Sequence, residues 1–144
     1  MVWISVEANI ASGKTTFLNL LSQNKYFESE ILYEPVDQWT KEGQNILDYF
    51  YKDPKRWSLT LQYYAFATRA ETYLKPQNQS LRVSERCLET DFKVFATNCY
   101  KSELLNTVEW SLYNKTYGIL NNTFNWLKPD GYVYLRADPN VCYN

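Results

Sequence analysis

The sequence predicts an α/β fold in which a parallel sheet carries helices on both of its faces. Short apolar runs typical of strands occur at residues 2–7, 31–33, 81–85 and 132–135. Longer segments with helical spacing separate these runs, and parallel strands need helical crossovers of that kind. The first run also passes directly into a loop of small residues and then into a helix. Together these three observations favour a P-loop NTPase-type sheet.

The loop after the first strand has the composition of a phosphate-binding loop. Residues 8–16 match the pattern G-x-x-x-x-G-K-[ST], except that Ala8 replaces the first glycine. We expect Gly13 to need a backbone conformation that a side chain would deny, whereas Ala8 is tolerable if its φ stays β-like. Backbone N–H groups and the following helix N-terminus would surround a nucleotide polyphosphate, Lys14 would reach its β- and γ-phosphates, and the Thr15 hydroxyl would bind Mg²⁺. The residues predicted to bind the nucleotide are Ala8, Asn9, Ile10, Ala11, Ser12, Gly13, Lys14, Thr15 and Thr16.

Composition limits the possible partners. The 144 residues are expected to form a single domain, and the net charge of −1 with dispersed basic residues argues against a nucleic-acid partner. No run approaches the roughly 20 apolar residues of a membrane span, so we expect a cytoplasmic protein without a membrane contact.

The cysteine and histidine content limits the possible chemistry. The chain has three cysteines, Cys87, Cys99 and Cys142, an odd number without metal-site spacing, which favours reduced, buried thiols. Because the chain has no histidine, carboxylates must carry any acid–base chemistry.

The remaining elements place acidic and basic residues at strand ends. Pro35 ends the second strand directly after Glu34, and the third strand ends at Glu85 and Arg86. Helices are predicted over 45–52, 54–73, 90–100 and 103–127, the second of them opened by Asp53 and Pro54. Ligands of parallel sheets gather at the carboxyl ends of the strands, so Glu34, Glu85, Arg86 and the loop are expected on one edge.

The end of the chain begins a helix at Asp138-Pro139 that has only five residues left after the proline. We expect that the chain lacks a further helix and a last strand. The alternative is a natural terminus that frays.

The long helix 54–73 is apolar on nearly all sides, with two polar exceptions. Gln62 and Arg69 lie two turns apart on one face, with the small Ala65 between them. Gln62 could pair with a base edge, and a buried Arg69 needs an acidic partner, for which Asp91 is our choice. The alternative is an internal polar network that ties helices together.

Several motifs occur in a specific order and spacing. They are the loop at 6–17, Glu34-Pro35-Val36, Pro54-Lys55-Arg56-Trp57-Ser58, Leu61-Gln62-Tyr63-Tyr64-Ala65 and Ser84-Glu85-Arg86-Cys87. This set resembles the deoxyribonucleoside kinase family, most closely its deoxycytidine kinase branch, over nearly the whole chain.

The resemblance implies an ATP-dependent kinase that phosphorylates the 5′-hydroxyl of a deoxynucleoside in nucleotide salvage. Deoxycytidine or a purine deoxynucleoside is favoured, because the thymidine-preferring branch carries larger apolar residues at the positions of Ala65 and Arg69. By resemblance, Glu34 is the general base, with Glu85 as the second candidate. Glu85 would also help to position Mg²⁺, and Arg86 would hold the sugar 5′ region and the transferred phosphoryl group.

The same resemblance implies a set of nucleoside contacts. Tyr51 would touch the sugar 3′-hydroxyl and Gln62 would pair with the base edge. Phe95 would stack on the base, Trp39 would wall the pocket, and Arg69 with Asp91 would meet the exocyclic group of the base. Family members are commonly dimers, so the helices at 90–100 and 103–127 are candidates for a homodimer surface.

Two features depart from the family pattern. Cys87 stands where the family usually has serine, and the lid arginines that the family supplies after Asp138-Pro139 are absent from the sequence. Two alternatives therefore stay open: a non-catalytic nucleotide-binding relative, and another P-loop phosphotransferase such as a nucleoside monophosphate kinase.

Overall fold

The computed structural model describes residues 1–125 and 127–143. The chain divides into two compact units. The sheet unit comprises Met1–Glu34, Lys75–Cys87 and Lys128–Asn144, and the helical unit comprises Pro35–Leu74 and Leu88–Leu127.

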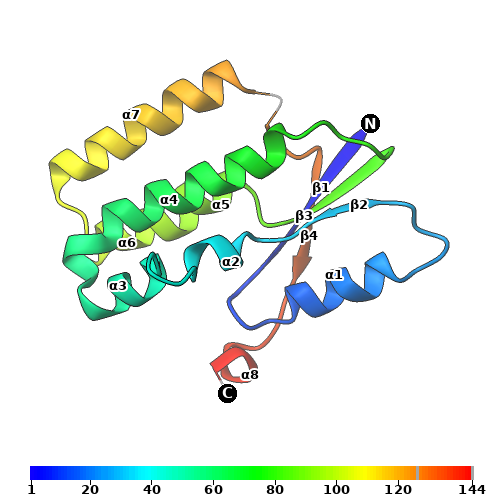
Figure 1. Cartoon of the computed structure of the whole chain (residues 1–144), viewed down its shortest axis with the longest axis horizontal. Helices are drawn as coiled ribbons and strands as arrows, with labels where there is room; N and C mark the ends of the chain where they lie inside the picture. Colours follow the sequence, from blue (N-terminus) through cyan, green and yellow to red (C-terminus); the bar gives the residue numbers. More distant parts are fainter. Residues whose placement is uncertain (126, 144) are drawn as a thin grey trace. The chain divides into compact units, whose positions relative to one another are not determined.

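The sheet unit is built on four parallel strands in the order β2-β3-β1-β4. The strands are β1 (Val2–Ala8), β2 (Glu30–Leu32), β3 (Leu81–Glu85) and β4 (Gly131–Leu135). They confirm the predicted strands to within one residue at each end, and with them the α/β fold with a parallel sheet. Helix α1 (Lys14–Ser22) follows the loop after β1, and α8 (Pro139–Tyr143) begins where Asp138-Pro139 predicted (Figure 1).

The core of the sheet unit lies between the strands and α1. Val6 and Leu18 are fully buried and cluster with Val83. Because β1 is flanked by β3 and β4, its carboxyl end lies beside the carboxyl end of β3, where the Arg86 N–H donates to the Val6 carbonyl at 3.0 Å. The loop after β1 and the residues after β3 therefore share one edge of the sheet.

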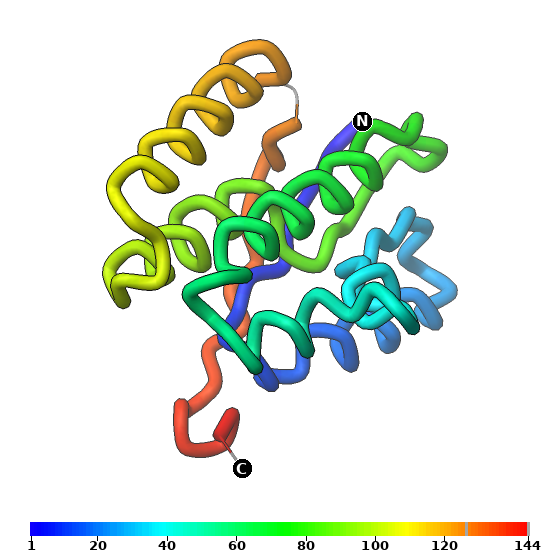
Figure 2. The backbone as a smooth tube through the Cα atoms, turned by 60° about the vertical axis from the view of Figure 1, so that its left-hand side comes forward, coloured from blue at the N-terminus to red at the C-terminus, as the bar shows by residue number. Residues whose placement is uncertain are grey.

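The helical unit contains seven short and long helical segments among the described residues. They are α2 (Val36–Trp39), α3 (Ile46–Lys52), α4 (Pro54–Leu74), α5 (Leu88–Thr90), the π-helix η1 (Asp91–Ala96), α6 (Thr97–Lys101) and α7 (Thr107–Thr123). Trp39, Ile46, Leu61 and Ala65 form one core cluster. Helix α7 lies along α4 in both views, and the rings of Tyr63 and Tyr113 join the two helices with centroids 5.3 Å apart (Figures 1 and 2).

Some helices begin or end at other residues than the sequence predicted, because local hydrogen bonds set their boundaries. The helix predicted over 103–127 begins at Thr107 and ends at Thr123, because Asn106 and Glu109 form a capping box that starts it. The helix predicted over 90–100 is present from Leu88 to Lys101, but its centre is π-helical. The short α2 was not predicted. Asp53 does cap α4, accepting from the Arg56 N–H at 3.2 Å.

The cysteines are free thiols, as the sequence predicted. Cys87 and Cys99 are buried, but Cys142 is half-buried on α8, so the prediction of burial was wrong for that residue. No helix within residues 1–125 and 127–143 has the length and apolar character needed to cross a bilayer.

The buried Tyr113 hydroxyl generates a stability prediction. Tyr113 is 2% exposed, and within the described part of the chain its hydroxyl has no hydrogen-bond partner. Burial, aided by the negative charge of Asp91, raises the pKa of this hydroxyl. Because a buried polar group without a partner is unfavourable, Tyr113→Phe should leave the free energy of unfolding unchanged or raise it by up to about 1 kcal/mol.

The matched control is Tyr63→Phe, because the Tyr63 hydroxyl is 2.9 Å from Thr116 Oγ1. Its loss should cost about 0.5–1.5 kcal/mol. Urea unfolding of both variants measures the difference. Equal destabilisation by the two substitutions would contradict the assignment.

Candidate functional site

The loop between β1 and α1 wraps a hollow of about 410 Å³ at the carboxyl edge of the sheet. Its lining consists of Ile10, Ala11, Ser12, Gly13, Lys14, Thr15, Thr16, Glu34, Glu85 and Arg86. The fold therefore brings the predicted loop residues of the sheet unit together with Glu34, Glu85 and Arg86. Apart from Ala8 and Asn9, every residue predicted to bind the nucleotide is part of this lining.

Two residues of the loop have left-handed backbone conformations. Ala11 has φ 59° and Gly13 has φ 88°. Alternation of right- and left-handed residues turns successive N–H groups toward one side and makes a concave anion site. A methyl group on Gly13 would meet no atom within 4 Å, so glycine is required there for its conformation and not for space. Ala8 ends β1 without a positive φ, which meets the condition set for its replacement of glycine.

Lys14 is buried at the base of this hollow. Its side chain is bent back along the loop, where Nζ donates to the Asn9 carbonyl at 3.0 Å and Ser12 Oγ donates to the same oxygen at 2.6 Å. Burial, reinforced by the positive charge of Arg86, lowers the pKa of Lys14, whereas Glu34 and Glu85 oppose the shift. Negative charge placed in the hollow would therefore favour the protonated lysine.

Glu85 joins the loop to the strand ends. Its Oε1 accepts from Thr15 Oγ1 at 2.7 Å, and its Oε2 accepts from the backbone N–H of Glu34 at 3.3 Å. The hydroxyl oxygen of Thr15 and a carboxylate oxygen of Glu85 thus lie side by side, although the two residues are far apart in the sequence.

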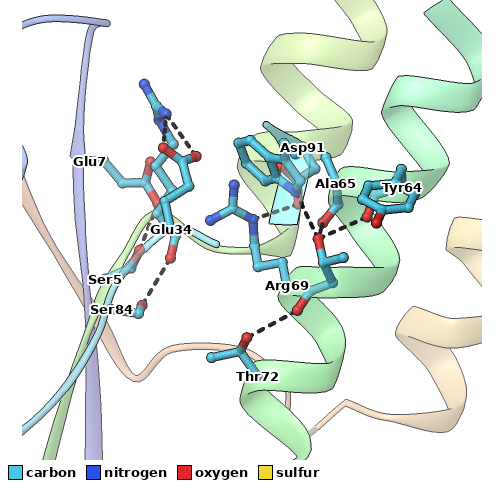
Figure 3. A network of polar contacts seen from close by, with 12 residues as sticks. Ser5, Glu7, Glu34, Tyr64, Ala65, Arg69, Thr72, Ser84 and Asp91 are labelled. Atoms are coloured by element: carbon cyan, nitrogen blue, oxygen red, sulfur yellow. Dashed lines mark hydrogen bonds and ion pairs between the residues drawn. The ribbon is translucent and has the colours of Figure 1, made fainter. Parts of the chain in front are cut away.

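Glu34 and Arg86 form a second pair on the same edge. Arg86 Nη1 donates to both carboxylate oxygens of Glu34 at 2.8 Å, with both side chains nearly buried (Figure 3). Arg86 itself has φ 64°, a conformation that costs about 1–2 kcal/mol for a residue with a Cβ. Strain of this kind concentrates at functional sites.

Residues that were not predicted hold Arg86 in this conformation. Trp3 Nε1 donates to Ser84 Oγ at 2.8 Å, and Ser84 Oγ donates to the Arg86 carbonyl at 2.9 Å. Ser84 is fully buried. The sequence signal was weak, because Ser84 shares β3 with the polar Arg82 and Glu85, and only the burial of the strand shows that its hydroxyl needs a partner.

The donor set of the hollow fits a magnesium ion. Within the part of the chain that the structure describes, no cluster of three or more acidic or cysteine side chains could hold a metal by itself. Mg²⁺ prefers oxygen ligands, keeps several waters, and is often held by only one or two protein groups together with substrate phosphates. The adjoining Thr15 hydroxyl and Glu85 carboxylate supply ligands of that kind.

The helical unit has its own buried polar cluster. Arg69 Nε donates to Asp91 Oδ2 at 2.8 Å, and both side chains are 2% exposed (Figure 3). Asp91 is thus the acidic partner that the sequence predicted. Gln62 is also buried, and its Nε2 lies 3.5 Å from Cys99 Sγ.

The other residues predicted to contact a nucleoside are arranged as follows. Trp39 is buried, its Nε1 donates to Thr68 Oγ1 at 2.9 Å, and the Arg69 guanidinium lies 5.8 Å from its ring centroid. Phe95 is half-buried in η1, whereas Tyr51 is exposed on α3. Within the helical unit, Trp39, Arg69 and Asp91 therefore form one group, whereas the exposed Tyr51 ring packs edge-on against Phe50, with centroids 5.4 Å apart.

The chain belongs to the deoxynucleoside kinase family, whose model matches residues 4–144. It is 39% identical to a probable deoxycytidine kinase of fowlpox virus over 142 residues, which cover 97% of this chain and 58% of that protein. It is 36% identical to human deoxycytidine kinase, covering 96% of this chain and 62% of the human one. Human mitochondrial thymidine kinase 2 is 37% identical, with 97% and 52% covered. The chain thus spans between about half and about three fifths of the length of these curated relatives.

The buried ion pair of the helical unit generates the next prediction. Asp91→Ala leaves Arg69 charged and buried, so it should lower the free energy of unfolding by about 3–5 kcal/mol. The double variant Arg69→Leu/Asp91→Ala removes both charges and should recover most of that loss. Urea unfolding measures all three variants.

The control is Asp48→Ala, which breaks the exposed pair with Lys52 on α3 and should leave stability nearly unchanged. A double variant no more stable than Asp91→Ala would contradict the account of the pair.

Proposed function

We propose that the chain is a deoxynucleoside kinase that transfers the γ-phosphate of ATP to the 5′-hydroxyl of a deoxynucleoside, with deoxycytidine or a purine deoxynucleoside preferred. The hollow that gathers Lys14, Thr15, Glu34, Glu85 and Arg86 around a phosphate-binding loop is the observation that carries the proposal. Family membership supports the class of reaction. The deoxycytidine kinases among the relatives support the preferred base.

In this proposal the sheet unit holds the phosphates and the reacting hydroxyl. Phosphoryl transfer passes through a loose transition state, so catalysis consists mainly of alignment and of neutralising charge. Lys14 and Arg86 would spread the charge of the transferred group. Mg²⁺, held by Thr15 and Glu85, would supply further charge neutralisation on the phosphate oxygens.

Glu34 is the proposed general base. It lies at the hollow with its carboxylate fixed by Arg86, whereas Glu85 is engaged with Thr15. This division supports Glu34 as the group that takes the 5′-hydroxyl proton and Glu85 as the group that positions the metal ion. An ionised glutamate is enough, because the proton can leave late in the reaction.

The helical unit supplies the proposed base recognition. Gln62 would pair with the base edge, Arg69 and Asp91 would meet its exocyclic group, and Phe95 would stack on it. The burial of Gln62, Arg69 and Asp91 supports this role, because desolvated polar groups discriminate strongly between ligands that satisfy them and ligands that do not. Tyr51 would contact the sugar, and Trp39 would form part of the pocket wall.

We further propose a cytoplasmic homodimer. Val108, Leu112 and Ile119 are exposed apolar residues on one side of α7, which supports a surface for a second copy. Sedimentation analysis of the chain would show twice its 17.1 kDa mass if this is so.

The function is tested by ATP-dependent phosphorylation of the four deoxynucleosides and their monophosphates. We expect turnover on deoxynucleosides, with a higher kcat/KM for deoxycytidine or a purine deoxynucleoside than for thymidine. Turnover on monophosphates alone would instead identify a nucleoside monophosphate kinase. Nucleotide binding without any turnover would identify a non-catalytic relative.

Glu34→Gln tests the catalytic assignment. The substitution keeps the size of the side chain and one oxygen acceptor for Arg86 but cannot take a proton, so kcat should fall by about 10²–10⁴-fold. The ATP dissociation constant should change by no more than about twofold.

Glu30→Gln is the matched control, because Glu30 pairs with buried Arg82 on β3 but is not part of the hollow. It should lower stability and leave kcat unchanged. Undiminished turnover in Glu34→Gln would remove Glu34 from the mechanism.

A further inference from the structure

The segment that carries Asp91 and Phe95 contains a turn that is wider than an α-helix. Leu88–Thr90 is α-helical, Asp91–Ala96 is a π-helix, and Thr97–Lys101 returns to α-helix. Such π-segments are rare, usually occur as single turns inside α-helices, and are frequent at functional sites.

The spacing of contacts along α4 explains why the wide turn is needed. Among the contacts between this segment and α4, Asp91 pairs with Arg69, and Cys99 lies against Gln62. The two α4 residues are seven positions apart, but their two partners are eight positions apart. At 3.6 residues per turn, seven residues return to nearly the same face, whereas eight overshoot it by about 80°. The π-turn absorbs the extra residue and lets both contacts form.

Thr97 closes this turn with two donors. Its backbone N–H donates to the Phe92 carbonyl, five residues earlier, and also to the Val94 carbonyl, and its Oγ1 donates to the Phe92 oxygen at 2.8 Å. The Phe92 ring is itself fixed by stacking on Tyr117, with centroids 4.2 Å apart and planes 7° apart. The hydroxyl therefore favours the five-residue hydrogen bond over the four-residue bond of an α-helix.

We propose that Thr97 is a positioning residue for base recognition: by holding the π-turn, it fixes the register in which Asp91 and Phe95 are presented to the base. This inference rests on the proposed function, which assigns both residues to the nucleoside. Loss of the wide turn would rotate the residues on one side of it relative to the other by about 100°, one α-helical step. Asp91 and Phe95 would then no longer keep their places relative to Gln62.

The test compares Thr97→Val, which replaces the hydroxyl with a methyl group of similar size, with Thr97→Ser, which keeps the hydroxyl. We expect Thr97→Val to raise KM for deoxycytidine about tenfold and to change the deoxycytidine to thymidine ratio of kcat/KM by a similar factor. The kcat with deoxycytidine and the ATP dissociation constant should stay within about twofold. Thr97→Ser should behave like the unaltered chain.

A second variant removes the extra residue itself. Val94 is exposed in the π-turn, and its deletion leaves seven positions between the partners of Arg69 and Gln62, the spacing that a continuous α-helix satisfies. The shortened chain should therefore unfold cooperatively with a Tm close to that of the full chain. Phe95 would stand three positions after Asp91 instead of four, a rotation of about 100°, so the base ratio should still change as it does in Thr97→Val. Failure to fold would contradict the register argument.

The outcomes separate the two proposals. If the unaltered chain phosphorylates no deoxynucleoside, the proposed function fails. If it does so and Thr97→Val loses stability while its base ratio is unmoved, Thr97 is only structural and this inference is overturned.

Discussion

The left-handed turn at Gly13 is the constraint on which the sheet unit depends. A triphosphate has more oxygen atoms than the side chains of one short loop could satisfy, so backbone N–H groups must surround it. They can do so only if the chain turns sharply between β1 and α1, and the conformations of Ala11 and Gly13 produce that turn. The central place of β1 in the sheet then sets the end of β3, with Glu85 and Arg86, beside the same loop.

Each charged group at the hollow already has an internal partner. Lys14 donates to a loop carbonyl, Thr15 donates to Glu85, and Arg86 donates to Glu34. These contacts satisfy buried polar groups that would otherwise be unfavourable, and they hold the side chains close to where a phosphate chain would need them. In the helical unit, buried Arg69 and Asp91 satisfy each other in the same way. Their pairing also requires that the segment containing Asp91 adopts a π-turn.

Much of this arrangement could be predicted from the sequence because it depends on local patterns. The loop motif, the strand ends at Glu34 and Glu85, and the spacing of Gln62 and Arg69 are all visible in the order of residues. The conformations of Ala11 and Arg86 could not be predicted, because tertiary hydrogen bonds such as Ser84 to Arg86 impose them. The π-turn was not predicted for a related reason. It depends on the spacing of the contacts with α4, and that spacing cannot be read from the sequence of the segment alone. The predicted boundaries of the helix that forms α7 were wrong, because the prediction did not include the capping box of Asn106 and Glu109.

The most direct test of the account is ATP binding, measured by titration calorimetry in the presence of Mg²⁺. Gly13→Ala and Gly43→Ala both place a methyl group on a residue with positive φ, 88° and 78°, where no atom lies within 4 Å. Both should therefore lose similar stability, about 1 kcal/mol. We predict that Gly13→Ala weakens ATP binding by at least about tenfold while Gly43→Ala binds as tightly as the unaltered chain. Unchanged affinity in Gly13→Ala, or no binding by the unaltered chain, would contradict the claim that this loop holds the phosphate donor.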